Sequence, residues 1–315
     1  MVKRILSNNA SELLAMSGEE LKQSIKASAG RVVLSENIVT ETPVVPDITN
    51  AEIARAFGAD LILLNGFDAF HPKVKNIDEH EQVIETLKRL VGRPIGVNLE
   101  PVDDGTNMYE QHLEIAEGRQ ASPETVQVLE ALGVDFICMT GNPATGVSNK
   151  KIVEAIQNTR NHFSGLIISG KMHSSGVDEP VITRAYVKQF IEAGADIILV
   201  PAVGTVPGFD EAQLKDIVKE VHREGGLVMS AIGTSQESAD PSTIRDFAIR
   251  NKICGVDIQH IGDGSYCGLA PVENIFELSK ALRGETHDID DCTFHKSLIK
   301  TPCINPWLQI FIGLF

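Results

Sequence analysis

Lys171 and His173 are the first candidates for chemistry, because both come at the end of an apolar run typical of a buried strand. Residues two apart in a strand point to the same side, so their side chains are expected together. An ammonium group among apolar residues can act as a base, form a Schiff base with a carbonyl compound or bind an anion. The alternative is a lysine that reaches into solvent, because Gly170 and Gly176 make the following turn flexible.

Carboxylates form the second group of candidates. Glu36 and Glu100 interrupt or end apolar runs, and Asp103 and Asp104 follow Glu100 closely. Their oxygens could bind Mg²⁺, or one of them could act as a general base. Structural hydrogen bonds for the two glutamates and a solvated loop for the two aspartates are the alternatives. No spacing identifies a metal site, so the metal stays unassigned, with Mg²⁺ as a possible cofactor.

Two glycine-containing segments follow the last two apolar runs: Gly233-Thr234-Ser235 and Gly262-Asp263-Gly264. Backbone N–H groups and hydroxyls in such adjacent loops, with helix N-termini behind them, hold phosphate in many α/β barrels. We therefore expect a pocket for a phosphate or carboxylate between them. The alternative is that the glycines only turn the chain.

Three asparagines and one histidine complete the candidate site. Asn65, Asn98 and Asn142 come at the ends of apolar runs, where their amides could bind a carbonyl or hydroxyl group of a small ligand. Asparagine also tolerates left-handed turns, which is the structural alternative. His260 interrupts the last apolar run just before the second glycine segment, and a hydrogen-bonded core histidine is its alternative.

These residues fall at regular places in a pattern of alternating strands and helices. We expect eight strands, at 32–38, 60–65, 94–99, 135–140, 165–171, 196–201, 226–232 and 255–261. Between and after them we expect helices near 49–57, 79–91, 122–132, 148–162, 180–193, 211–224, 241–251 and 271–282. Every candidate above then lies at the carboxyl end of a strand or in the loop that follows, which is where barrel enzymes carry their active sites.

An internal repeat favours a closed barrel. Glycine, a small residue and aspartate recur before every second strand, ending at Asp60, Asp135, Asp196 and Asp257. Such a glycine fits the left-handed residue that ends a helix. A doubly wound sheet would also require a GxGxxG turn after its first strand, where this chain has Ser-Glu-Asn. The sequence therefore predicts the α/β class and a single (β/α)₈ TIM barrel.

Length and composition agree with one large domain and restrict the partners. The 315 residues divide into an N-terminal helical extension (1–30, with one amphipathic helix over 10–29), the barrel (31–284) and an atypical tail (285–315). The tail contains Cys292, Cys303 and the apolar stretch 307–315. This stretch could dock on a partner subunit or be an exposed aggregation segment, or the whole tail could be an anomalous sequence. A net charge of −15 argues against nucleic acid and membrane surfaces as partners. The chain has five cysteines without CxxC spacing, no leader-like segment and no long apolar run, and these features predict a cytoplasmic protein. We also expect it to be a homo-oligomer.

Short motifs resemble known families. Residues 65–70 (Asn-Gly-Phe-Asp-Ala-Phe) and 94–98 (Pro-Ile-Gly-Val-Asn) resemble the second and third strands of the photosystem-biogenesis-factor family of barrels, and the order of elements is similar to the phosphoenolpyruvate mutase and isocitrate lyase superfamily. Residues 170–173 remotely resemble the catalytic loop of that superfamily. Residues 3–6 and 17–21 resemble uncharacterised bacterial proteins labelled phosphonomutase-like or haloacid-dehalogenase-like. The resemblance implies a barrel with a phosphate pocket, whereas the dehalogenase motif Asp-x-Asp-x-Thr is missing after the first strand.

Together these features predict an enzyme, a lyase or isomerase, for a small phosphorylated or carboxylated carbonyl compound. Gly233, Thr234, Ser235, Gly262 and Gly264 would hold the anion. Lys171 or Glu100 would move a proton or stabilise an enolate, and Glu36 would orient that group or share Mg²⁺ with it. Two alternatives stay open: a barrel that binds a metabolite or assists assembly without turnover, and a metal-dependent phosphohydrolase. The absence of HExxH, GxSxG and the P-loop pattern argues against the common zinc hydrolases, esterases and nucleotide phosphatases.

Overall fold

The predicted barrel is confirmed. The computed structural model describes residues 2–78, 82–103, 105–109 and 111–287. Eight parallel strands pair in chain order and close on themselves, with β1 hydrogen-bonded to both β2 and β8. Their bounds are β1 (Val32–Ile38), β2 (Leu61–Asn65), β3 (Ile95–Leu99), β4 (Phe136–Met139), β5 (Leu166–Gly170), β6 (Ile197–Pro201), β7 (Leu227–Ile232) and β8 (Ile258–Ile261).

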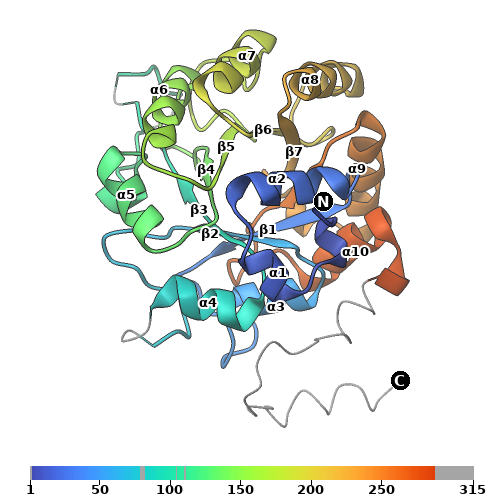
Figure 1. Cartoon of the computed structure of the whole chain (residues 1–315). Coiled ribbons are helices and arrows are strands. Elements are labelled where there is room, and N and C mark those ends of the chain that lie inside the picture. Colours follow the sequence, from blue (N-terminus) through green and yellow to red (C-terminus); the bar gives the residue numbers. More distant parts are fainter. Residues whose placement is uncertain (1, 79–81, 104, 110, 288–315) are drawn as a thin grey trace, which may run out of the picture.

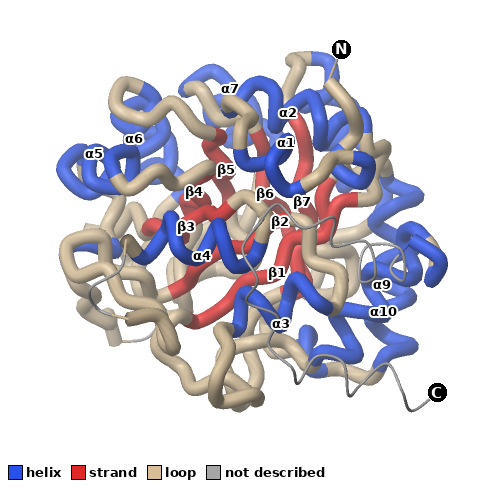
Figure 2. The backbone as a smooth tube through the Cα atoms, turned by 60° about the horizontal axis from the view of Figure 1, so that its bottom comes forward, coloured by secondary structure: helices blue, strands red, loops and turns tan. Residues whose placement is uncertain are grey.

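A ring of helices surrounds the strands (Figure 2). They are α3 (Asn50–Ala56), α4 (Val83–Val91), α5 (Pro123–Ala131), α6 (Asn149–Arg160), α7 (Arg184–Ala193), α8 (Glu211–Arg223), α9 (Pro241–Cys254) and α10 (Val272–Arg283). Their positions agree with the sequence pattern apart from some ends. The helix expected from residue 180 begins at Arg184, because Thr183 caps it by accepting a hydrogen bond from the N–H of Tyr186. The helix expected to end at 251 continues to Cys254 and ends at the left-handed Gly255, so β8 begins later than expected.

The N-terminal extension contains two short helices where the pattern predicted one over 10–29. Ser17 and Glu20 form a capping box that starts α2 (Gly18–Ala27) afresh after α1 (Ala10–Leu14). Both helices lie across one end of the barrel (Figure 1). Leu13, Leu21 and Ile25 are buried in the same apolar cluster as the inward-facing side chains of the strands. The extension thus covers the amino-terminal end of the barrel.

The four repeated aspartates lie at that same end and make equivalent contacts. Each carboxylate accepts a hydrogen bond from a backbone N–H of the preceding odd-numbered strand, at 2.8–3.0 Å; the donors for Asp60, Asp135, Asp196 and Asp257 are Val33, Ile95, Ile167 and Val228. Each also faces a basic side chain from the helix that precedes that strand around the ring, namely Arg283, Lys88, Arg160 and His222 in the same order, at 2.6–2.7 Å. The sequence repeat therefore corresponds to four copies of one strand-pairing contact.

Inward-facing residues change in character along the barrel axis. In β1 and β2 these positions are apolar near the amino-terminal end, with Leu34 and Leu63 in the interior cluster. Two residues further on, the same faces carry Glu36 and Asn65, and β8 carries His260; all three are at most 7% exposed. Buried polar groups are costly unless they are paired, so this end of the barrel is the place to look for a site.

Parts of the predicted organisation lie outside the described residues. The tail over 285–315 is described only as far as His287, so its cysteines, its apolar end and its suggested docking are outside the structure, and Asp104 is outside it as well. In the described part of the chain, no helix combines the length and apolar character needed to cross a membrane.

Candidate active site at the mouth of the barrel

Glu36 and His260 form the innermost polar pair at the carboxyl end of the barrel. Oε2 of Glu36 lies 2.8 Å from Nε2 of His260. The His260 ring is fully buried and Glu36 is 3% exposed. An ionised carboxylate only accepts hydrogen bonds, so with Glu36 ionised Nε2 carries the shared hydrogen. Nδ1 of His260 is then left, buried and without a hydrogen-bond partner, as the nitrogen that can take up a proton.

The three predicted asparagines join this pair in one continuous set of hydrogen bonds. Asn98 donates to Oε1 of Glu36 at 3.5 Å and to Oδ1 of Asn65 at 3.3 Å. Asn65 and Asn142 exchange hydrogen bonds between their amides at 3.1 Å. The amides come from the ends of β2 and β3 and from the loop after β4, so the closed barrel brings together side chains that are far apart in sequence.

Glu100 continues the set on the other side of Asn142. Its carboxylate accepts from the side chain and backbone of Asn142 at 3.0 and 2.9 Å, and it pairs with Arg119 at 2.8 Å. Glu100 is 1% exposed. The charge of this carboxylate is therefore balanced by Arg119, which the sequence did not single out.

Asp263 branches from Asn65, which donates to its Oδ2 at 2.9 Å. Burial and the nearby charge of Glu36 raise the pKa of Asp263 to about 8. Asp263 is therefore mostly protonated at neutral pH and can donate a hydrogen. We call the connected residues the mouth network: Glu36, Asn65, Asn98, Glu100, Arg119, Asn142, His260 and Asp263.

The two glycine segments enclose a carboxylate of the chain itself. A side chain at Gly264 would place its Cβ 1.7 Å from Oε1 of Glu237, which lies after β7 in η3 (Gln236–Ser238). The backbone N–H groups of Gly264 and of Glu237 lower the pKa of this carboxyl, while burial, the larger effect, raises it. Glu237 thus occupies the space where a phosphate would be expected, and the phosphate pocket remains a prediction.

The hydroxyl residues of the first glycine segment face outward. Thr234 and Ser235 are exposed and have left-handed backbones, with φ of 60° and 67°. The hydroxyl of Thr234 donates to the backbone oxygens of Gly233 and Thr205, at 2.6 and 3.2 Å. None of the hydrogen bonds described above joins Thr234 or Ser235 to the mouth network.

Lys171 is fully buried directly after β5, so the alternative of a lysine reaching into solvent is wrong. Its Nζ donates to Oε1 of Glu179 at 2.7 Å. Burial lowers the pKa of Lys171, and Glu179 opposes this effect. The backbone and side-chain N–H groups of Asn149 also donate to Glu179, at 2.7 and 2.9 Å. Lys171 therefore ties the loop after β5 to the start of α6.

His173 lies near two carboxylates of the mouth network, although its side chain is only half-buried. It is half-buried, and the carboxylates of Glu36 and Glu100 are close enough to raise its pKa, although burial has the larger effect and lowers it. Its Nδ1 accepts a hydrogen bond from the N–H of Ser175 at 3.0 Å. This bond leaves Nε2 as the nitrogen that can face a ligand.

The described carboxylates among the expected metal ligands have other partners. Glu36 faces His260, Glu100 faces Arg119, and Asp103 accepts from the hydroxyl of Ser148 at 2.5 Å. Over the described ranges of the chain, no three His, Cys, Asp or Glu side chains are grouped as metal ligands. The described residues therefore give no reason to place Mg²⁺ in the mouth network.

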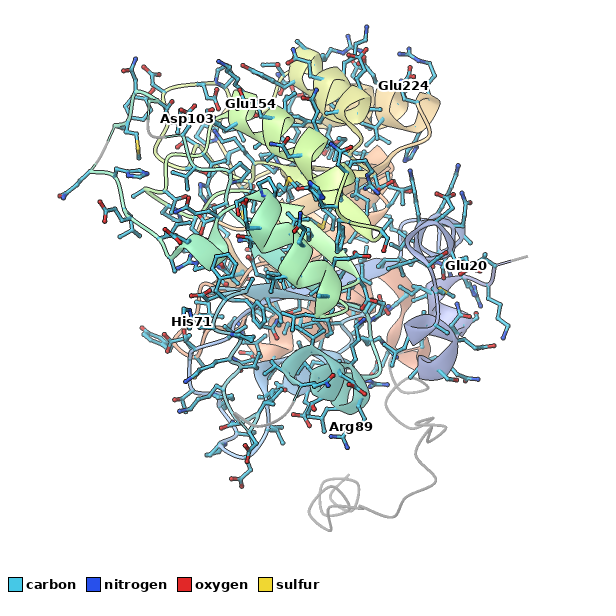
Figure 3. The ribbon with its side chains drawn as sticks, turned by 60° about the vertical axis from the view of Figure 1, so that its left-hand side comes forward. Glu20, His71, Arg89, Asp103, Glu154 and Glu224 are labelled. Atoms are coloured by element: carbon cyan, nitrogen blue, oxygen red, sulfur yellow. The ribbon has the colours of Figure 1, made fainter. Side chains whose placement is uncertain are left out.

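Loops after β3, β4 and β5 are joined over this end of the barrel. Asp103 donates its N–H to Gly146, and the N–H groups of Gly146 and Tyr109 donate to the backbone oxygens of Ser175 and Gly176, at 2.9–3.3 Å. In Figure 3, Asp103 and His71 mark this end, whereas Glu20 and Glu224 lie at the opposite end. Glu36, Asn98 and Glu100 are at most 4% exposed at this end of the barrel.

A pocket of about 400 Å³ lies between the segments that follow β5 and β6. Pro201, Ile182 and Phe209 give it apolar walls, and Arg184 and Asp216 also line it. None of its lining residues belongs to the mouth network. The pocket and the polar network are thus two separate features.

Sequence reasoning missed three residues of this region: Arg119, Glu179 and Glu237. Each lies in a segment that connects a strand to the next helix, beyond the strand ends on which the prediction relied. Glu237 alone carried a signal, since it is a carboxylate only two residues after the first glycine segment. Arg119 and Glu179 are recognisable only by the partners that the fold gives them.

Comparison with solved structures shows that the chain is distantly similar to several known proteins. The chain is similar to 2,3-dimethylmalate lyase, a PEP mutase/isocitrate lyase superfamily member, at 11% identity over 81% of each chain with a TM-score of 0.47. A putative lyase/mutase from Burkholderia cenocepacia is 16% identical over 78% of this chain and 82% of that one, with a TM-score of 0.48. Thiamine phosphate pyrophosphorylase from Pyrococcus furiosus is 14% identical over 81% and 98% of the two chains, with a TM-score of 0.46. Likeness at this level carries no information on activity.

A family model also matches most of the chain, and no curated protein matches. The matched residues, 6–294, include α1, α2, all eight strands and every member of the mouth network. The chain therefore belongs to the family described as Domain of unknown function (DUF7916).

Proposed function

We propose that this chain is a lyase or isomerase that moves a proton on a small carbonyl compound at the mouth of the barrel. The observation that carries this proposal is the buried Glu36–His260 pair, in which Nδ1 of His260 has no partner. Buried polar atoms normally have a hydrogen-bond partner. A bound substrate is a natural partner for this one.

The network also supplies groups for the carbonyl end of such a substrate. Nδ1 of His260 would take a proton from the carbon next to the carbonyl, and the electron pair of that C–H bond would move onto the carbonyl oxygen. Asn65, Asn98 and Asn142 would orient hydroxyl or carbonyl groups.

The sequence predicted Lys171 or Glu100 as the group that moves the proton. Both are held by partners of opposite charge, Glu179 and Arg119, at 2.7 and 2.8 Å. These contacts favour positioning roles for Lys171 and Glu100 and leave the proton transfer to His260. The phosphate or carboxylate expected on the substrate, and a role for His173, stay predictions.

Hydrogen exchange tests this function without knowledge of the full reaction. The protein is incubated in D₂O with a set of three-carbon ketones: hydroxyacetone, dihydroxyacetone phosphate, pyruvate and aminoacetone. Proton NMR then follows loss of the signals next to the carbonyl. We expect exchange of at least one ketone above the rate without protein, and loss of this exchange in Glu36→Gln.

The control is Glu224→Gln, which makes the same chemical change at an exposed residue at the opposite end of the molecule (Figure 3). Equal exchange with and without protein for every ketone would overturn the proposed function. Binding of a ketone without exchange, unaffected by Lys171→Ala and Glu100→Gln, would instead favour a metabolite-binding barrel.

A further inference from the structure

The predicted anion pocket is filled by the chain's own carboxylate. Oε1 of Glu237 lies where any side chain at Gly264 would have to be, and the backbone N–H groups of this segment face it. The side chain is 2% exposed. An incoming phosphate would have to displace a negative group of similar chemistry from these N–H groups. The position therefore does not favour an anionic ligand.

The basic groups around the mouth network already have anionic partners. Arg119 pairs with Glu100 and Lys171 with Glu179, both within 2.8 Å. Three further carboxyl groups lie close together. The charge of Glu36 raises the pKa of Glu237 and of Asp263, Glu237 also raises the pKa of Asp263, and His260 lowers that of Glu237. Carboxyl groups therefore outnumber basic groups here.

Unpartnered acceptors indicate a ligand with hydrogen-bond donors. Oε2 of Glu237 is buried and has no hydrogen-bond partner, and the same holds for Oδ1 of Asn98, which is 4% exposed. A buried carboxylate oxygen without a donor is costly. A hydroxyl group on the ligand would donate one hydrogen and carry no charge. An ammonium group donates three hydrogens, and its positive charge balances the excess of carboxyl groups.

On the basis of the function proposed above, we propose that the substrate carries a protonated amine, and that Glu237 and Asp263 bind this ammonium group beside the Glu36–His260 pair. The absence of a metal-ligand grouping in the described part of the chain favours an organic cation over a metal ion. Because Asp263 would have to be ionised to bind a cation fully, binding would release its proton. Among the groups around Asp263, the charges of Glu36 on β1 and Glu237 in η3 raise its pKa, and Asn65 on β2 donates a hydrogen bond to it.

Two measurements test this substrate class. The first compares kcat/KM for deuterium exchange of aminoacetone with that of hydroxyacetone. Glu237→Gln keeps the size of the side chain and removes its charge, so we expect it to lower the value for aminoacetone by about 10- to 100-fold, as for loss of one charge-assisted hydrogen bond. The value for neutral hydroxyacetone should change less than about threefold, and Glu224→Gln should change neither.

The second measurement is binding of 2-aminoethanol, followed as an increase in Tm. We expect binding that is lost in Glu237→Gln and that becomes stronger from pH 7 to pH 8.5, as Asp263 releases its proton. Asp263→Asn should abolish this pH dependence. MgCl₂ serves as a parallel probe, and stabilisation by Mg²⁺ that depends on Glu237 would overturn the amine assignment.

The results separate this inference from the proposed function. Exchange that depends on Glu36 and prefers dihydroxyacetone phosphate or pyruvate would overturn the amine and leave the proposed function intact. Exchange of none of the ketones, together with Glu237-dependent binding of 2-aminoethanol, would overturn the function and support the ammonium site. Absence of both amine binding and preference for aminoacetone would overturn the inference.

Discussion

The carboxylate of Glu36 lies 2.8 Å from Nε2 of His260, although the two residues are 224 positions apart in the chain. They meet because β1 and β8 close the barrel, with Leu34 paired in register with His260. Both side chains face the interior near the carboxyl ends of their strands, Glu36 two residues and His260 one residue before the last. The closure of the barrel thus creates the acid–base pair on which the proposed function depends.

Removal of the Glu36 charge is expected to abolish proton transfer while the barrel stays folded. In Glu36→Gln the amide cannot stabilise a second proton on His260, so exchange should fall by about 10² to 10⁴-fold. Deuterium exchange by NMR measures the loss, and circular dichroism with thermal unfolding checks the fold. Exchange at the rate of the unmodified protein in a folded Glu36→Gln variant would remove this residue from the mechanism.

Asp263 should make the protein less stable as pH rises through the neutral range. Its pKa is about 8 in the folded state, against about 3.9 in an unfolded chain. Between these values the folded state holds a proton that the unfolded chain has released, so the free energy of unfolding falls as pH rises. Asp263→Asn removes this titration and should have a higher Tm than the unmodified protein at pH 8, with the difference vanishing near pH 4.

Parallel Tm profiles for the two proteins between pH 4 and pH 8 would show that Asp263 is ionised throughout.

Asp240→Asn is a suitable comparison. The hydroxyls and backbone N–H groups of Ser242 and Thr243 lower the pKa of Asp240 to about 2, which is a shift in the direction opposite to that of Asp263. Its stabilising effect is present above the ordinary pKa of an aspartate and is lost as pH falls toward 2.

Lys171 and Glu179 should behave as a coupled buried ion pair. Lys171→Met leaves Glu179 without its ammonium partner, and Glu179→Gln leaves a fully buried ammonium group, so each should lower the free energy of unfolding by about 3–5 kcal/mol. The double variant should lose less than the sum of the two. Urea unfolding of the four proteins gives the coupling.

Borohydride reduction in the presence of pyruvate checks the competing role of Lys171 as a Schiff-base amine. We expect no modified Lys171 by mass spectrometry, because its Nζ is held by Glu179. A reduced adduct on Lys171 would show that this lysine reacts with carbonyl compounds.

The repeated aspartates should each contribute to the stability of the closed barrel. Asp60→Ala removes the acceptor for the N–H of Val33 and the carboxylate partner of Arg283, whose side chain is 1% exposed. We expect a loss of about 3–5 kcal/mol. Asp60→Asn should lose less, because its amide oxygen can still accept from Val33. Equal stability of the alanine variant and the unmodified protein would contradict a stabilising role.

His222 makes one of these four contacts sensitive to pH. Its hydrogen bond to Asp257 raises the pKa of the imidazole, so the charged pair stabilises the fold below the ordinary pKa of histidine and is lost as pH rises through the raised value. The difference in Tm between the unmodified protein and His222→Gln should therefore shrink from pH 6 to pH 8.5. His222 is partly exposed, so the effect should be small. The difference made by Arg283→Gln, at an equivalent contact, should stay constant over this range.

The sequence determined the barrel, its strands and most of the mouth network. Alternation of apolar runs with helical segments located all eight strands, and the rule that catalytic groups follow strand ends selected Glu36, Asn65, Asn98, His260 and Asp263. The strands are confirmed because the period of a strand is a local feature of the chain. A polar residue within an apolar run is equally local, so the sequence could select these side chains, whose roles stay predictions.

The tertiary structure decided which charges meet. Lys171 and Glu100 had the right positions for catalysis, but the fold gives them Glu179 and Arg119 as partners, and it places Glu237 where the sequence predicted an external anion. Ion pairs depend on loops whose paths no local pattern specifies, and a buried charge takes its chemical character from its neighbours in space. For that reason the sequence by itself predicts the residues of this site, while their partners follow only from the closed barrel.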